Sequence, residues 1–536
     1  MVRRVLALGL LLALGCLGVS CGGSSTATPA SPTGVSGAGT LYFVLGDTPA
    51  CDVLALRLDV SQLTLNVANS TNTVGVLGST STLINFDLAA LRNSETILAV
   101  RPTQAGTFNK FSVGLTALTM YVYNPANDPP IGILTESLTT GSPPVKYNVS
   151  PPLKIDNLGV SVLSLDFDLQ HVVQLDSQGN ITGFVDPVAT ASAPTSSTVN
   201  GFGTMDGIEG FVTTVNTTGF VSGSTTFTGG VSLQLLANPI SSVAGPGVTV
   251  DLTKATALCA EPVPPASPQS NQACSAIPLD TILTDSYATA DAYIDKNGNL
   301  TATTLTIGPQ EFPANNLVAF IGPVLSVTRG SDGNVTGFTM FLRDAQPPAS
   351  GVNLDTAVTV SLAPGTIYNT YPPAPQPGAT IPATNFAALP FGASAIAPGE
   401  QVVVHGVYTI PTPATPPAVT PLVSTAANEV DLKTQTQEGN FGTLLAVQPD
   451  DVTGAFTLSP CATLFQQGDA PALPIYVFTS PATSFVHLPG LTSLRSQPPV
   501  MVKGLLFYET ESVTINGVTV PAGKLVMLAK AVVQSS

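Results

Sequence analysis

Residues 54–60 read LALRLDV, and residues 61–67 continue as SQLTLNV. An apolar side chain stands at every second position from Leu54 to Val60, and the pattern returns from Leu63 to Val67. Successive side chains of a strand point to opposite faces of its sheet, so this alternation predicts a half-buried β-strand. The 48 Gly and 47 Pro residues imply many turns. The sequence therefore predicts an all-β protein.

The length of the chain predicts several domains. Its 536 residues exceed the usual size of a single domain, which is about 100–200 residues. Charged residues make up only 9% of the chain, while hydrophobic residues make up 44%. This composition is not that of a disordered chain. We therefore expect folded domains whose surfaces carry Ser and Thr in place of Lys and Glu.

The first 20 residues have the pattern of a secretory signal peptide. Arg3 and Arg4 are followed by an uncharged, Leu-rich run from Val5 to Val19 and then by small residues. The apolar run is too short to span a bilayer core of about 30 Å as a helix. The sequence therefore predicts export from the cytoplasm.

Cys21 follows this segment directly and resembles the acceptor cysteine in the lipobox of bacterial lipoproteins. The resemblance implies that its sulfur receives a lipid and becomes the new amino terminus. Two alternatives stay open: lipidation of Cys16, or ordinary secretion with Cys21 incidental. Residues 21–38 are rich in Gly, Ser, Thr and Pro and predict a flexible tether. We expect an extracytoplasmic protein with a lipid anchor, held at the outer membrane or the cell surface.

The charge of the chain excludes one class of partner. The formal net charge is −16, and no Lys/Arg cluster occurs after Arg4. Proteins that bind nucleic acid need a basic surface that displaces counterions from the phosphates. We therefore expect no nucleic-acid partner, and the motifs predict no cofactor.

The cysteines predict one local disulfide. Cys259 and Cys274 flank a Pro- and Ser-rich segment, which in an oxidising compartment is typical of a closed loop. A zinc site would need two further ligands nearby, and the sequence offers none there. Cys51 and Cys461 lie far apart in the sequence, and the sequence does not decide whether they pair.

The amino-terminal block resembles a known but uncharacterised domain family. The resemblance rests on five short motifs in order: Gly39-Thr40, the turn at residues 47–50, the strand at 54–60, Asp166-Phe167-Asp168-Leu169, and residues 184–188. The family occurs at the amino terminus of bacterial envelope lipoproteins. It implies a β-sandwich over residues 39–190 and no established activity. Near residues 85–91 the apolar spacing loosens, and we expect a short helical turn.

After a linker at residues 190–200, a pattern recurs about every hundred residues. Each copy begins with an apolar strand around a Gly, at residues 210–215, 322–327 and 442–447. The copies resemble small β-barrel repeats that follow such domains in soil-type bacterial lipoproteins. We therefore expect β-barrel-like repeats at residues 203–309, 317–436, with Pro-rich insertions, and 438–534. The whole chain would be an array of separate modules extending from the anchor.

Candidate catalytic residues are few. Asp166 and Asp168 lie two residues apart, so they share one face of a predicted strand. Paired carboxylates serve acid–base chemistry or bind a cation, although a solvated sheet face is the simpler interpretation. The three histidines, His171, His405 and His487, lie far from one another, and the sequence holds no zinc-protease, nucleophile-elbow or phosphate-loop motif. The sequence predicts no metal site.

Two further patterns have a structural and a functional interpretation. The segment from Asp295 to Asn299 fits a hairpin turn better than a calcium loop, because its Gly is in the fourth position and no distal Glu follows. A sugar-binding surface needs aromatic rings, yet Trp is absent, and Tyr368, Tyr371 and Phe386 are the one cluster to test. We expect a non-enzymatic protein with a structural or adhesive role toward a polysaccharide or an envelope protein. The alternative is an extracellular hydrolase of glycans or peptides.

Overall fold

The computed structural model describes most of the chain after residue 36. The described residues are 37–48, 51–69, 71–75, 84–87, 96–136, 145–168, 173–175, 181–185, 189–194, 201–202, 204–235, 247–260, 275–284, 286–310, 317–331, 334–346, 352–370, 389, 391–409, 423–465, 473–481, 483–486 and 488–534. These residues are almost entirely strands and turns, so the predicted all-β class is confirmed. No helix among them is both long and apolar enough to cross a bilayer.

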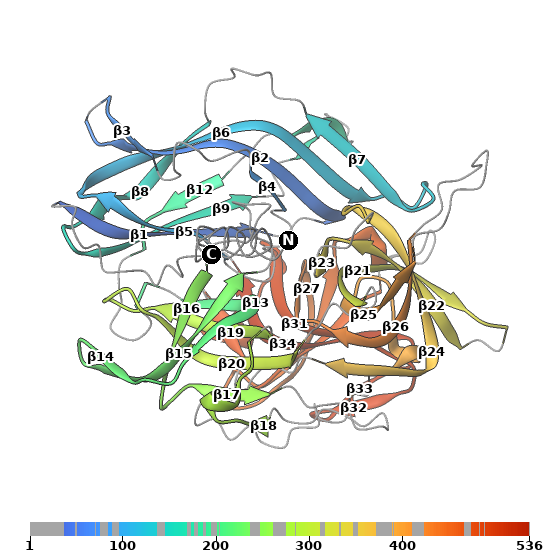
Figure 1. Ribbon diagram of the computed structural model, residues 1–536. Coiled ribbons are helices and arrows are strands. Elements are labelled where there is room, and N and C mark those ends of the chain that lie inside the picture. The colour runs from blue at the N-terminus through green and yellow to red at the C-terminus, as the bar shows by residue number, and fades with distance from the viewer. Residues whose placement is uncertain are drawn as a thin grey trace, which may run out of the picture.

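The amino-terminal part is a ten-stranded sheet folded into two layers (Figure 1). Its strands follow the order β3-β2-β6-β8-β12-β9-β1-β5, with β4 on β2 and β7 on β6. Phe43 of β1 and Phe111 of β6 are fully buried with ring centroids 5.0 Å apart, so the two layers share a core. The elements are β1 Ala38–Thr48, β2 Val53–Val67, β3 Thr73–Gly75, β4 Ile84–Asp87, β5 Thr96–Gln104, β6 Gly106–Tyr123, β7 Ile131–Glu136, β8 Val145–Ile155, β9 Val160–Asp168, β10 Val173–Leu175, β11 Ile181–Val185 and β12 Ala189–Ser192.

Barrel 1 is the sheet that runs from β13 to β20. The circuit β13-β15-β16-β20-β19 closes on itself, because β19 also pairs with β13. Its elements are β13 Thr204–Asn216, β14 Phe220–Ser222, β15 Thr225–Leu235, β16 Gly247–Thr253, β17 Ala257–Ala260, β18 Ser275–Ala276, the 3₁₀ turn η2 Leu279–Thr281, β19 Ser286–Ile294 and β20 Leu300–Gln310.

Barrel 2 closes in the same way through β21-β22-β24-β26-β25, with β25 returning to β21. Its elements are β21 Leu317–Arg329, β22 Val335–Leu342, β23 Asp344–Gln346, β24 Thr356–Thr370, η4 Ala393–Ala395, β25 Gln401–Thr409 and β26 Val423–Leu432.

Barrel 3 closes through β27-β28-β29-β34-β31, with β31 returning to β27. Its elements are β27 Gln435–Val447, β28 Gly454–Pro460, η5 Thr463–Phe465, β29 Ile475–Thr479, β30 Ser484–Val486, η6 Leu491–Ser493, β31 Val500–Glu509, β32 Val513–Ile515, β33 Val518–Val520 and β34 Lys524–Gln534.

The three barrels share one strand order. Numbering the five barrel strands along each chain segment gives 1-2-3-5-4-1, and in each barrel strands 3 and 5 are parallel. This is the connectivity of the five-stranded Greek-key barrel called the OB-fold. Closing a sheet removes its edges, so each barrel buries an apolar interior without exposing long unpaired strands.

The modules are packed against one another instead of being strung out along the chain (Figure 1). Tyr42 and Val162 of the amino-terminal sheet belong to the same buried cluster as the interior of barrel 1. The interior of barrel 2 is continuous with residues on the outer face of barrel 3, such as Leu505 and Phe507. The chain forms several sheet-built modules, as expected, but they are packed together and do not extend as an array. Alternation shows that a face is apolar, but it does not show what covers that face.

The helical turn expected near residues 85–91 is contradicted for residues 85–87. Residues 84–87, at the start of the expected helical turn, form strand β4 and pair with β2 between Arg57 and Val60. The pairing available along the exposed edge of β2 replaces the local preference for a turn. Residues 88–95 lie outside the described part.

Candidate functional site

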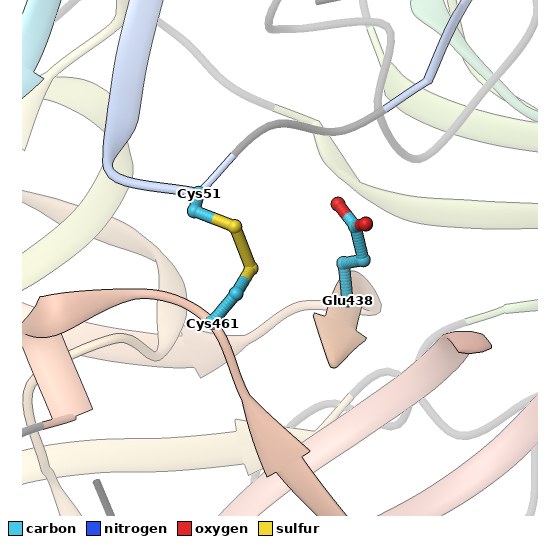
Figure 2. Close-up of side chains that lie close together, drawn as sticks. All are labelled: Cys51, Glu438 and Cys461. Carbon is cyan, nitrogen blue, oxygen red and sulfur yellow. A yellow bond between two sulfur atoms is a disulfide. The ribbon is translucent and has the colours of Figure 1, made fainter. Parts of the chain in front are cut away.

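A disulfide joins the two ends of the folded chain. Cys51, in the turn before β2, is bonded to Cys461, which follows β28 of barrel 3, across a sequence separation of 410 residues. Figure 2 shows this bond together with the side chain of Glu438 on β27. The bond therefore fixes the amino-terminal sheet to the last barrel.

Glu438 is held beside the disulfide by the sheet of barrel 3. Strands β27 and β28 pair with Gly439 opposite Pro460, and the N–H of Cys461 donates to the carbonyl oxygen of Glu438 at 3.1 Å. The Glu438 side chain is buried, and one of its carboxylate oxygens lies within 4.8 Å of both cysteine sulfurs. We call Cys51, Cys461 and Glu438 the sulfur–carboxylate cluster.

Two arginines hold the amino-terminal sheet on barrel 2. Arg57 of β2 makes a bidentate pair with Asp355, with N–O distances of 2.7 and 2.8 Å. Arg343, which is only 6% exposed, donates to the carbonyl oxygen of Leu54 at 2.9 Å. Leu54 and Ala55 pack in the same cluster as Phe341 of barrel 2. Charge-assisted, bidentate bonds of this kind are among the stronger polar contacts in proteins.

The contact with barrel 1 contains two acidic residues. The hydroxyl group of Tyr42 donates to the carbonyl oxygen of Gly298, in the β19–β20 turn, at 2.6 Å. Burial and the nearby charge of Asp295 raise the pKa of Asp251, on β16, to about 7. Burial, together with the charges of Asp251 and Asp295, raises the pKa of Tyr42. The contact therefore contains a carboxyl group that ionises near neutral pH.

The barrels are also joined to each other by polar contacts. Lys530 of β34 pairs with Asp291 of β19 at 2.8 Å, which links barrel 3 to barrel 1. Glu400, which is fully buried between barrels 2 and 3, accepts a hydrogen bond from the N–H of Ala397 at 3.0 Å. Burial raises the pKa of Glu400 well above its usual range. Polar links of this kind, with shared apolar cores, connect all four sheets.

Comparison with known proteins identifies the amino-terminal part alone. Residues 38–183 match the family described as Domain of unknown function (DUF4382). The expectation of an uncharacterised domain at this end of the chain is confirmed. No curated protein matches the chain. A crystal structure of the single-stranded DNA binding protein from Thermus aquaticus is 13% identical and covers 41% of this chain and 93% of its own, with a TM-score of 0.13. So low a TM-score carries no argument about ligand or fold.

Asp166 and Asp168 lie on β9, inside the DUF4382 match. Their backbones pair with Gly46 and Thr48 of β1, in the parallel register of those two strands. The structure describes no side-chain position for either residue. Val162, earlier on β9, packs into the barrel 1 cluster. The described part of β9 therefore contacts barrel 1.

The other cysteines predicted from the sequence are only partly described. Cys259 is disulfide-bonded and 5% exposed. Cys274, its expected partner, lies outside the described residues, so that pairing stays a prediction. The lipidation candidate Cys21 and its competitor Cys16 also lie outside them.

The segment from Asp295 to Asn299 forms a hydrogen-bonded turn between β19 and β20. The Asp295 carboxylate accepts bonds from the N–H groups of Asn297 and Asn299, at 2.8 and 2.9 Å, and from the Asn299 amide at 2.7 Å. Gly298 has φ +85°, a conformation that glycine adopts at no steric cost. Both carboxylate oxygens of Asp295 therefore accept hydrogen bonds within the turn.

Of the three histidines and the three aromatic residues considered in the sequence, the structure describes His405 and Tyr368. His405 Nε2 lies 3.0 Å from Asp431 Oδ2 on the neighbouring strand of barrel 2. Tyr368 is half-buried and meets the edge of Phe391 at 6.0 Å between ring centroids. Tyr371, Phe386, His171 and His487 lie outside the described residues. Tyr368 is therefore part of the packing around barrel 2 instead of a free aromatic platform.

Sequence reasoning missed the residues that join the sheets. Arg57, Arg343 and Glu438 have no motif around them, because they contact residues in distant parts of the sequence. Asp355 lies 298 residues from Arg57, and Leu54 lies 289 residues from Arg343. The sequence does offer one signal. It has only 17 Lys and Arg residues in 536, so each basic residue is a candidate for a specific ion pair with a carboxylate.

Proposed function

We propose that this chain is a membrane-anchored extracytoplasmic lipoprotein whose folded part is a rigid, non-catalytic body for binding or structural support. The leader sequence and Cys21 support the anchor. The disulfide between Cys51 and Cys461 supports an oxidising compartment, since such bonds persist outside the cytoplasm. The DUF4382 match adds no activity.

One observation carries the non-catalytic role: the amino-terminal sheet and the three barrels are joined by one disulfide, by a partly buried ion pair and by shared apolar clusters. Enzymes that close over a substrate need elements that move, and these are drawn from weakly packed regions. A body held at every junction instead presents its loops at fixed distances from one another. This property suits attachment to an extended polymer or to another envelope protein.

The β14–β15 hairpin of barrel 1 is the surface that we propose meets a polysaccharide. Phe220 is 36% exposed and lies stacked on the buried ring of Phe227, with centroids 4.6 Å apart and planes 15° apart. The hairpin connects barrel strands 1 and 2, and in OB-folds this loop takes part in binding oligonucleotides and oligosaccharides. The net charge of −16 favours a neutral sugar over a nucleic acid.

The anchor is tested by mass spectrometry of the chain purified from bacterial membranes. We expect a diacylglycerol-type modification on Cys21, and release of the protein from membranes in Cys21→Ser. The matched control is Cys16→Ser, which should stay anchored. Recovery of the native chain from membranes without any fatty acid would refute the lipoprotein proposal.

Binding is tested by retention of the full chain on columns of neutral cell-wall polysaccharide. We expect retention that is lost in Phe220→Ser and kept in Ile133→Ser, because Ile133 is equally apolar and 61% exposed but lies on the amino-terminal sheet. Equal retention of both variants would exclude the hairpin as the contact. Absence of retention for the unaltered chain would refute polysaccharide binding.

A hydrolase is the second candidate, and the pair of His405 with Asp431 is the observation that favours it. A histidine oriented by a carboxylate is one half of the serine-hydrolase arrangement. If the protein hydrolyses glycans or peptides, turnover should be lost in His405→Asn or in the double variant Asp166→Asn with Asp168→Asn, with the fold intact. Under our proposal no turnover is measured, and polysaccharide retention survives both changes.

A further inference from the structure

The sulfur–carboxylate cluster contains the donor set of a metal site. Two cysteine sulfurs and one carboxylate oxygen all lie within 4.8 Å of one another. The side chains of the cluster come from two modules, with Cys51 on the amino-terminal sheet and the other two on barrel 3 (Figure 2). A tetrahedral zinc ion holds two thiolate sulfurs about 3.8 Å apart, so the two sulfurs, which are bonded at 2.03 Å in the disulfide, must move apart once that bond is broken.

Contacts other than the sulfur–sulfur bond also hold the three residues near one another. Cys461 and Glu438 are neighbours through the pairing of β27 with β28 and the 3.1 Å backbone hydrogen bond. Cys51 stands three residues before Leu54, whose carbonyl oxygen accepts from the buried Arg343 of barrel 2. Barrel 2 in turn shares a buried cluster with barrel 3. After reduction, both thiols and the carboxylate therefore remain close together.

We propose that reduction of the Cys51–Cys461 disulfide converts this junction into a binding site for a thiophilic divalent cation, with zinc as the type case. Two thiolates and one carboxylate are ligands that zinc accepts in proteins, and a water molecule completes four-coordination. The two thiolates balance the charge of the cation, and the buried carboxylate of Glu438 supplies the third protein ligand. In this way the link between the first and last modules is kept in both redox states.

The redox step balances with a dithiol as the reductant. The dithiol gives up two electrons and two protons and becomes a disulfide, while the sulfur–sulfur bond of Cys51 and Cys461 breaks and each sulfur gains a proton. The cation then displaces both thiol protons, because the thiolate is the ligand form. Binding therefore releases two protons for each metal ion.

The test uses the full chain and Co²⁺ as an optical probe for the zinc site. The chain is reduced with a phosphine, which becomes a phosphine oxide by taking oxygen from water, and the phosphine is then removed under argon. We expect a thiolate-to-cobalt absorption band that appears only after reduction and that Zn²⁺ displaces. We expect the Cys51→Ser and Cys461→Ser variants each to lose absorbance in this band, and the absorbance that both lose is the signal of this site.

Controls separate this site from the other thiols. Cys259→Ser removes a cysteine elsewhere and should leave the assigned band unchanged. Glu438→Gln keeps both cysteines and should weaken Co²⁺ binding at least about tenfold, since even groups that merely support a ligand cost that much. The matched variant Glu509→Gln, a buried carboxyl group elsewhere in barrel 3, should have no effect.

Two results would overturn the proposal. The first is a band in the reduced chain that is the same with and without Cys51. The second is unchanged Co²⁺ affinity in Glu438→Gln, a variant whose disulfide and fold are checked in the oxidised state by circular dichroism.

Discussion

Replacing Asp251 with Asn should remove a specific part of the pH dependence of this protein. Asp251 lies on β16 of barrel 1 and is 9% exposed, against the contact that Tyr42 makes with the β19–β20 turn. Burial and the charge of Asp295 raise its pKa from 3.8 to about 7. Asn has the same shape and no charge, so the variant removes ionisation with little change in packing.

The size of this effect on the free energy of unfolding follows from the difference between the pKa of Asp251 in the folded chain and in the unfolded chain. Below pH 3.8 the carboxyl group is protonated in both states and contributes no difference. As the pH rises toward 7, the unfolded chain releases this proton while the folded chain keeps it, so the free energy of unfolding falls by about 1.4 kcal/mol per pH unit. Above about pH 7 the loss levels off at about 4 kcal/mol. Asp251→Asn should not lose this stability.

Hydrogen exchange of the β16 amides, followed by mass spectrometry at pH 4 and pH 8, measures the free energy of local opening around Asp251. The free energy of opening should fall by about 4 kcal/mol more in the unaltered chain than in Asp251→Asn. Glu400 and Glu509, whose pKa values burial also raises, titrate in both proteins and cancel in the comparison. Asp156→Asn, which removes an exposed carboxylate, serves as the control. An equal change with pH in both proteins would refute the assignment of this dependence to Asp251.

Three further outcomes test how the modules are joined. Arg57→Met leaves the partly buried Asp355 without its guanidinium partner, so urea denaturation should show a loss of up to about 3–5 kcal/mol, and a loss below about 1 kcal/mol would contradict a tight junction. Gly322→Ala places a Cβ against the backbone oxygen of Phe341 on β22 and should lower the melting temperature, whereas Gly365→Ala meets nothing within 4 Å and should not. Breaking the Cys51–Cys461 disulfide opens a loop of 410 residues, so the chain-entropy argument predicts that the free energy of unfolding falls by up to about 6 kcal/mol. Guanidinium titration measures this loss, and an unchanged free energy would show that the other contacts hold the modules together without the bond.

The features that the sequence predicted correctly are local ones. The alternation in residues 54–67 is strand β2, and the run from Asp295 to Asn299 is a turn closed by its own hydrogen bonds. In both cases the physical cause lies within a few residues of the pattern. Side-chain direction alternates by geometry along a strand, and Asp, Asn and Gly carry turn chemistry themselves.

The features that escaped prediction depend on closure of the whole chain. Arg57 occupies a polar position in an alternating strand, which indicates the face it shares but not that barrel 2 would cover that face with Asp355. Cys51 and Cys461 pair because two interfaces, between the amino-terminal sheet and barrel 2 and between barrels 2 and 3, place the first and last modules next to each other. No spacing in the sequence encodes that approach, so the sequence decides neither their pairing nor the cluster with Glu438.

The long separation of Cys51 from Cys461 has a consequence for biogenesis. At about 5–20 residues per second, the ribosome needs roughly 20–80 s after making Cys51 to complete the 410 residues that lead to its partner. Cys259 emerges about midway and is an earlier, incorrect partner. Correct maturation therefore requires either that the Cys51 thiol stays reduced until Cys461 is available or that an incorrect disulfide is rearranged. The yield of this protein should therefore be sensitive to disulfide isomerase.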